Sequence, residues 1–194
     1  MGYRLEAIIA PEKSIIRFMD SHDPKRVVSL PQGFAMIPLD ECTCKSIDGS
    51  LNVSYQSLLT SQWDGCAEPM HKVLVELSDQ GFASLLVIDC FGGPCDQRGI
   101  VYQNGHLIYN RYVDADNDQG MYLWKMKTGF SLLWAKLMSL PLGASKPNPN
   151  HAPSVAHELL ELIGVQCEGG SFDAFDQMGL GQFRKTEDWL NHGS

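Results

Sequence analysis

The apolar positions of residues 82–112 carry the clearest pattern in the chain. The run from Phe82 to Cys90 is apolar or β-branched and is followed by glycines and a proline, which predicts a buried strand ending in a tight turn. Asn104-Gly105 stands between two further apolar stretches and suits the positive φ of a type I′ turn. The pattern predicts a three-stranded meander whose two turns lie at residues 91–97 and at Asn104-Gly105.

The N-terminal region predicts further strands. Residues 3–10 alternate, with Leu5 on one side and Arg4 and Glu6 on the other. Pro11 opens a short helix, and residues 27–37 form two short strands, or one strand broken by the Pro31-Gln32-Gly33 turn. The apolar face expected for that helix consists of Ile15, Ile16, Phe18 and Met19.

Helical spacing of apolar residues recurs later in the chain. The helices expected lie at 40–47 with Asp40 as N-cap, 55–62, 67–80, 131–139 and 154–163, with a strand at 122–126 and a loop at 141–153. The aromatic residues of the tail predict that it packs onto the body. The fold class expected is α+β: one domain over residues 1–194, mainly an antiparallel sheet with a central meander and packed helices, with an insertion at 113–150.

The charge of the chain argues against some classes of binding partner. The 194 residues carry a formal net charge of −8, and no basic run occurs, which argues against sequence-independent binding of nucleic acid. An acidic surface suits a basic protein partner. No segment reaches the roughly 18 consecutive apolar residues of a membrane helix, and the N-terminus carries no signal pattern. We therefore expect a soluble cytoplasmic protein that binds no membrane.

The cysteines and carboxylates indicate neither a metal site nor a cofactor. There are six cysteines, and without a secretion signal we expect reduced thiols. Cys42-Thr-Cys44 lacks the spacing of a zinc knuckle. The acidic stretch 114–120 resembles the start of a calcium loop, but Gln119 and Lys125 occupy the places of its glycine and its bidentate glutamate. A solvated acidic loop is the better interpretation.

The turn at 91–97 offers two kinds of chemistry. One hypothesis makes Cys95 a nucleophile on a glycine-rich turn with His106 as its base, although the strand between them would keep the two apart. Asp89, Asp96 and Gln97 flank the same turn. They either form a polar cluster for a ligand or partner, or serve the turn itself, with Gln97 bridging strands; we favour the second interpretation.

The C-terminal residues Arg184, Asp188 and Trp189 also allow two interpretations. They either anchor a partner, because Arg and Trp are enriched at interfaces, or tie the tail to the body through an ion pair and a buried indole. The second interpretation leads.

Several motifs resemble a family of uncharacterised bacterial proteins. They are Phe91-Gly92-Gly93 with Gln97, Gly179-Leu180-Gly181 with Arg184, Thr186 and Asp188-Trp189, Gly2-Tyr3, Pro31-Gln32-Gly33-Phe34 and Pro38-Leu39. The sequence departs from that pattern at Pro94-Cys95 and over 113–150. By analogy with small acidic proteins of this build, the resemblance implies an immunity-type protein that neutralises a partner toxin, with a basic toxin domain as partner. The alternative is a small thiol-dependent hydrolase acting at the turn.

Overall fold

The computed structural model describes residues 2–20, 26–40, 43, 68–91, 95–113, 154–166 and 174–191. Four expected elements lie outside these residues: the helices at 55–62 and 131–139, the strand at 122–126, and the loop at 141–153. So do the insertion predicted after residue 113 and the turn residues Gly92 and Gly93. Asp40 Oδ1 accepts a hydrogen bond from the Thr43 amide at 2.5 Å, as an N-cap does, whereas the rest of that predicted helix is not described.

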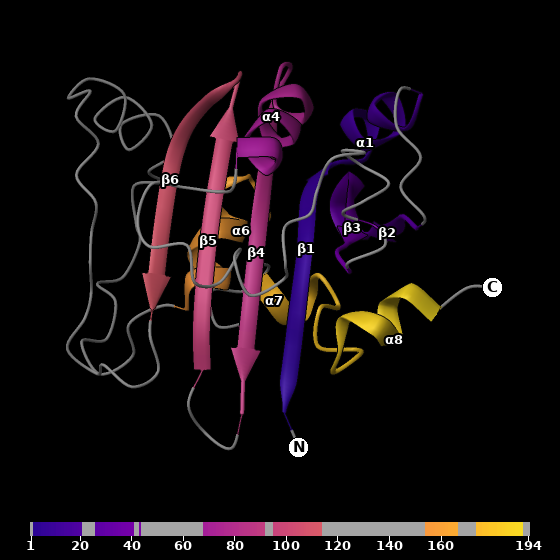
Figure 1. Cartoon of the computed structure of the whole chain (residues 1–194), viewed down its shortest axis with the longest axis vertical. Coiled ribbons are helices and arrows are strands. Elements are labelled where there is room, and N and C mark those ends of the chain that lie inside the picture. The colour runs from indigo at the N-terminus through magenta and orange to yellow at the C-terminus, as the bar shows by residue number, and fades with distance from the viewer. Residues whose placement is uncertain are drawn as a thin grey trace.

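The described strands form one six-stranded antiparallel sheet in the order β2-β3-β1-β4-β5-β6 (Figure 1). The strands are β1 (Tyr3–Pro11), β2 (Val28–Leu30), β3 (Phe34–Pro38), β4 (Phe82–Cys90), β5 (Cys95–Gln103) and β6 (His106–Val113). The α+β class and the meander β4-β5-β6 are confirmed. Strand β1 lies inside the sheet, because it pairs with β3 on one side and β4 on the other.

The meander turn predicted over 91–97 is too long, because β5 already begins at Cys95. Two other predicted turns form as expected. Asn104 and Gly105 have φ of 49° and 76°, the positive values that a type I′ turn requires, and they join β5 to β6. Pro31–Gly33 forms a short 3₁₀ turn, η1, between β2 and β3, so the two-strand interpretation of this region is correct.

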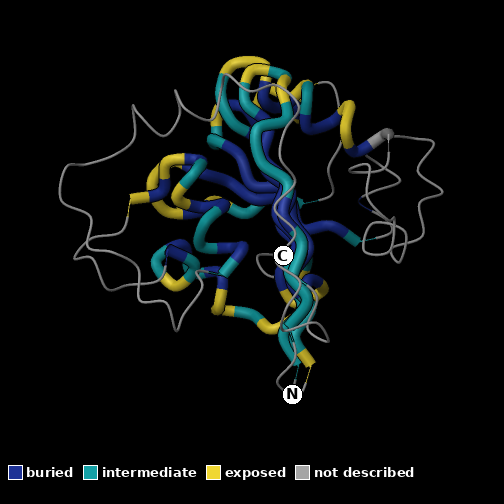
Figure 2. Tube along the Cα trace, turned by 90° about the vertical axis from the view of Figure 1, so that its left-hand side faces the viewer, coloured by how far each residue is buried: buried dark blue, intermediate teal, exposed yellow. Residues whose placement is uncertain are grey.

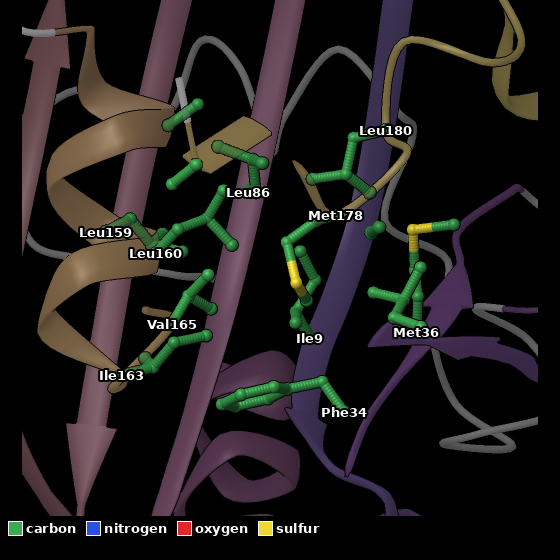
Figure 3. Close-up of a cluster of buried hydrophobic side chains, with 14 of the residues drawn as sticks. Ile9, Phe34, Met36, Leu86, Leu159, Leu160, Ile163, Val165, Met178 and Leu180 are labelled. Atoms are coloured by element: carbon green, nitrogen blue, oxygen red, sulfur yellow. The ribbon is translucent and has the colours of Figure 1, made fainter. Parts of the chain in front are cut away.

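Helices cover both faces of the sheet, and each face has its own apolar core. The helices are α1 (Glu12–Met19), α4 (Glu68–Leu77), α6 (Val155–Leu162), α7 (Ala174–Gln177) and α8 (Thr186–Asn191). Helices α1 and α4 pack on one face, and α6, α7 and α8 supply the core of the other (Figures 1 and 3). Figure 2 shows the buried strands between these outer layers.

Helix α1 corrects one prediction. Ile15 and Phe18 are buried as expected, but Ile16 is 57% exposed and Met19 is 44% exposed. Pro11 ends β1 and stands at the N-cap position, so the helix starts one residue later than predicted. The apolar stripe of this short helix is therefore narrower than its sequence suggests.

The C-terminal segment completes the sheet at β1. Strand β3 pairs with Ala7–Pro11, so the first residues of β1 extend beyond it on that side. There the Arg4 amide donates to the Arg184 carbonyl at 2.6 Å, and Arg4 forms a parallel bridge with Lys185. The prediction that the tail packs onto the body is confirmed.

Candidate functional site

Strand β4 ends and β5 begins at the end of the sheet next to the N-terminus, where Tyr3 pairs with Cys90 (Figure 1). Strands β4 and β5 pair in register from Phe82↔Gln103 to Cys90↔Cys95, so these two cysteines are the last paired residues before the turn. Phe91 follows directly and is 80% exposed, more than the other exposed large apolar residues of the described chain. Gly2 lies beside it, because a Cβ built there would be 3.2 Å from the Phe91 ring. We call Phe91 with Cys90 and Cys95 the hairpin tip.

Cys90 and Cys95 are joined by a disulfide bond. The expectation of reduced thiols is therefore wrong for these two cysteines. The physical reason is the register of the hairpin, which places the two residues directly opposite each other. Cys42, Cys44, Cys66 and Cys167 lie outside the described residues.

The disulfide also prevents Cys95 from acting as the nucleophile of the hydrolase hypothesis. In this state Cys95 has no thiol proton to give up and its sulfur is already bonded, so it cannot attack a substrate as a thiolate. His106 is equally unsuited as its base, because it pairs with Gln103 at the far end of β5. Eight residue steps at about 3.3 Å separate Cys95 from Gln103, a distance of roughly 26 Å. The structure does not bring Cys95 and His106 together.

Charged residues form a row across the sheet on the face that carries α4. Arg4 of β1 pairs with Asp89 of β4, which pairs with Asp96 of β5. Arg4 Nε is 4.0 Å from Asp89 Oδ2 and 3.7 Å from Glu6 Oε1. Asp89 and Asp96 face each other directly across two strands, an arrangement of like charges that costs free energy unless cations compensate it. Arg4 supplies one such charge.

Buried charges continue this row toward the middle of the sheet. Glu6 is fully buried, and Arg98 is 6% exposed although it carries a guanidinium group. Val87 lies between them, paired with Glu6 on one side and with Arg98 on the other. The sequence placed Arg4 and Glu6 correctly on one side of β1, but it gave no signal that this side is buried. We call Arg4, Glu6, Asp89, Asp96 and Arg98 the charged row.

Gln97 does not belong to the charged row. Because side chains alternate along a strand, Gln97 lies on the opposite face from Asp96, and it contacts α6 there. Its Oε1 accepts a hydrogen bond from the Val155 amide at 3.0 Å, and its Nε2 donates to Cys95 Sγ at 3.5 Å. The expectation that Gln97 bridges strands is wrong. It joins the hairpin tip to the first residue of α6.

The interpretation that the C-terminal motif ties the tail to the body holds for Trp189. Trp189 is 2% exposed, and its ring meets that of Phe183 edge to face at 4.8 Å. The indole therefore belongs to the core, as the tie-down interpretation expects. The side chains of Arg184 and Asp188 are exposed. Thr186, which the sequence singled out only through the resemblance, is buried and bonds to β1.

A second polar group holds α6 against the edge strand β6. Arg111 of β6 is buried and forms an ion pair with Glu158 of α6, and the Tyr109 hydroxyl donates to the same carboxylate at 2.8 Å. Burial, followed by the hydrogen bond and charge of Glu158, raises the pKa of Tyr109 far above its ordinary value. Burial lowers the pKa of Arg111, but Glu158 more than offsets this and raises it overall. These groups stay protonated and serve to fix the helix.

Comparisons with protein-family models, with curated proteins and with solved structures give no match. Among the described residues, no group of three or more His, Cys, Asp or Glu side chains could hold a metal ion. Nor is any helix in the described part of the chain long and apolar enough to cross a membrane.

Proposed function

We propose that this chain is a protein-binding module and that the hairpin tip is its contact surface. The observation that carries the proposal is the 80% exposure of Phe91 at the end of a disulfide-linked hairpin. An exposed aromatic ring next to a disulfide-linked strand pair offers a partner much apolar area at little cost in conformational entropy. Aromatic residues of this kind dominate the binding energy of many interfaces.

Charge indicates the kind of partner. The chain carries a formal net charge of −8, and two carboxylates, Asp89 and Asp96, stand beside the tip with part of their side chains accessible. Arg4 Nε lies 4.0 Å from the Asp89 carboxylate. A basic protein would gain from this arrangement through faster encounter and through complementary contacts around the Phe91 ring. We therefore propose a basic protein partner.

The specific form of the proposal is an immunity-type inhibitor that neutralises a basic toxin domain. Its support is the resemblance of the Phe91-Gly92-Gly93 and C-terminal motifs to a bacterial family, together with the acidic charge. The alternative of a thiol-dependent hydrolase has no comparable support, because Cys95 is bonded to Cys90 and His106 lies at the far end of β5.

Affinity capture from extracts of the source cells tests the proposal. The tagged chain is expected to retain a basic protein that Phe91→Ser loses at least tenfold, and that Ile16→Ser, which removes another exposed apolar side chain, retains in full. Equal retention of the partner by both variants would contradict the role of the hairpin tip as the contact surface.

A second pair of variants tests whether the acidic charge beside the hairpin tip speeds association with the partner. Asp96→Lys is expected to slow association and weaken its dependence on salt. Asp79→Lys is the matched control, because Asp79 is exposed near Gly81 at the other end of β4. Identical association rates for wild type and Asp96→Lys would contradict the electrostatic part of the proposal.

A further inference from the structure

We propose that Cys90 and Cys95 form a reversible thiol–disulfide site, reduced by a dithiol, whose redox state controls both the hairpin tip and the start of α6. The proposal goes beyond the binding function, because its chemistry and its structural consequences concern this chain alone. It stands on three observations: where the bond lies in the sheet, how accessible it is, and what the sulfur of Cys95 contacts.

The position of the bond lets it break without unfolding the sheet. It links only the last pair of the β4–β5 ladder, and the remaining pairs continue to Phe82↔Gln103. Strand β4 is also held by β1 along most of its length, and β5 by β6. Reduction therefore releases the tip while the rest of the sheet stays paired.

The bond is open to a reductant. Both cysteines are half-buried, in contrast to the fully buried middle of β4 and β5, and the residue that follows Cys90 is the exposed Phe91. A thiolate must approach a disulfide sulfur to exchange with it, so access decides which disulfides are labile. A bond at the accessible end of a hairpin meets this condition.

The exchange needs a dithiol as co-reactant. Its thiolate attacks one sulfur of the pair and displaces the other as a thiolate, which takes a proton, leaving a mixed disulfide. The second thiol of the reductant then attacks the mixed disulfide and releases the remaining protein thiol. The protein gains two electrons and two protons, and the reductant leaves as its own cyclic disulfide.

Gln97 links the redox state of Cys90 and Cys95 to the start of α6. Its amide nitrogen donates to Cys95 Sγ, while its amide oxygen accepts from the Val155 amide at 3.0 Å. Val155 is the first residue of α6, where backbone amides have no partner within the helix. When the covalent bond breaks, the two sulfurs separate to a nonbonded distance, and Gln97 loses the fixed sulfur that orients it. The Val155 amide then loses its hydrogen-bond acceptor and exchanges its hydrogen with solvent faster.

The test uses the full chain with Cys42, Cys44, Cys66 and Cys167 replaced by Ser, so that Cys90 and Cys95 are its sole thiols. It is equilibrated in mixtures of reduced and oxidised dithiothreitol, quenched with acid, and labelled with a maleimide of known mass. We expect either no label or two labels per chain, with a two-electron dependence on the dithiothreitol ratio. Two labels at every ratio would overturn the proposal.

Hydrogen exchange followed by mass spectrometry tests the structural consequence. On reduction, exchange of the Val155 amide is expected to accelerate roughly tenfold, whereas the amides of Leu85 and Tyr102, in the middle of the sheet, keep their rates. Gln97→Ala removes the link, so its Val155 amide should exchange fast in both redox states. Unchanged exchange at Val155 in the otherwise unmodified chain would also overturn the proposal. Neither measurement involves a partner, so both outcomes are independent of the binding function.

Discussion

The Thr186 hydroxyl oxygen lies 3.1 Å from the backbone nitrogen of Glu6, a residue 180 positions earlier, and accepts its hydrogen. The same hydroxyl reaches the Arg4 carbonyl at 3.5 Å. Through these contacts a side chain at the start of α8 takes the place of a strand beside the first part of β1. The two ends of the sequence are thereby joined at a buried position.

Thr186→Val should destabilise the protein by about 1–3 kcal/mol, because it leaves the buried Glu6 amide without its acceptor while it preserves the volume of the side chain. Urea unfolding followed by circular dichroism measures the change. Thr186→Ser retains the hydroxyl and should recover most of the lost stability. If the Val variant is as stable as the wild type, the Thr186 hydroxyl does not hold the tail.

Gly99 allows α6 to approach β5. A Cβ at this position would lie 2.7 Å from Val155 Cγ1 and 3.0 Å from Tyr109 Cε1, closer than carbon atoms pack. Gly99→Ala is therefore expected to cost about 1–3 kcal/mol in the free energy of unfolding. Gly181→Ala is the matched control, since a Cβ there would meet its nearest neighbours at 3.7 Å, and its stability should change by less than about 0.5 kcal/mol. Equal effects would contradict this packing.

The ion pair between Arg111 and Glu158 should also contribute to stability. Glu158→Gln leaves the buried guanidinium without its counter-charge, and we expect a loss of about 2 kcal/mol, a value that allows for the partial exposure of Glu158. Glu161→Gln, one turn later on α6, affects a carboxylate that is 58% exposed and should change stability by less than about 0.5 kcal/mol. Thermal melts of both variants at neutral pH make the comparison.

Stability should fall at alkaline pH. Burial and the Glu158 carboxylate raise the pKa of Tyr109 in the folded state, whereas the unfolded chain loses this proton near pH 10.0. Above that pH the folded state binds more protons than the unfolded state, so the free energy of unfolding decreases by about 1.4 kcal/mol per pH unit for each such group. Burial acts on Tyr3 in the same way. Below about pH 10 neither group changes stability.

Tyr109→Phe should remove one such group, and therefore give a shallower loss of stability than the wild type between about pH 10 and pH 11. Tyr3→Phe should have a similar effect, and the double variant should approach a flat profile in this range. Urea unfolding at a series of pH values provides the measurement. An unchanged slope in the double variant would contradict the assigned cause.

The parts of the fold that the sequence predicted are those set by local chemistry. Asn104-Gly105 fixed a hairpin because both residues accept positive φ, and the helical spacing over 154–163 predicted the helix observed as α6 (Val155–Leu162). The disulfide was not predicted, because the chain shows no secretion signal and its thiols are then expected to stay reduced. The turn predicted over 91–97 also placed Cys95 within the turn, whereas the observed register pairs it with Cys90.

The charged row depends on contacts that no local pattern reveals. Arg4 meets Asp89 because β1 lies inside the sheet, between β3 and β4, and this neighbour relation joins segments far apart in sequence. The burial of Glu6 has the same origin. In α1, periodicity predicted a wide apolar face, but the short helix buries only Ile15 and Phe18 of it. How much of a stripe is covered depends on the elements that pack against it.

Photo-crosslinking from the hairpin tip tests the central claim most directly. A chain with p-benzoylphenylalanine in place of Phe91 is expressed in cells of the source organism and irradiated, and its adducts are identified by mass spectrometry. A chain with the same group in place of Ile16 is the control. The account predicts that position 91 captures one basic protein that the control does not, and that Asp96→Lys reduces its yield. Adducts identical to those of the control, or none at all, would contradict a partner-binding role for the tip.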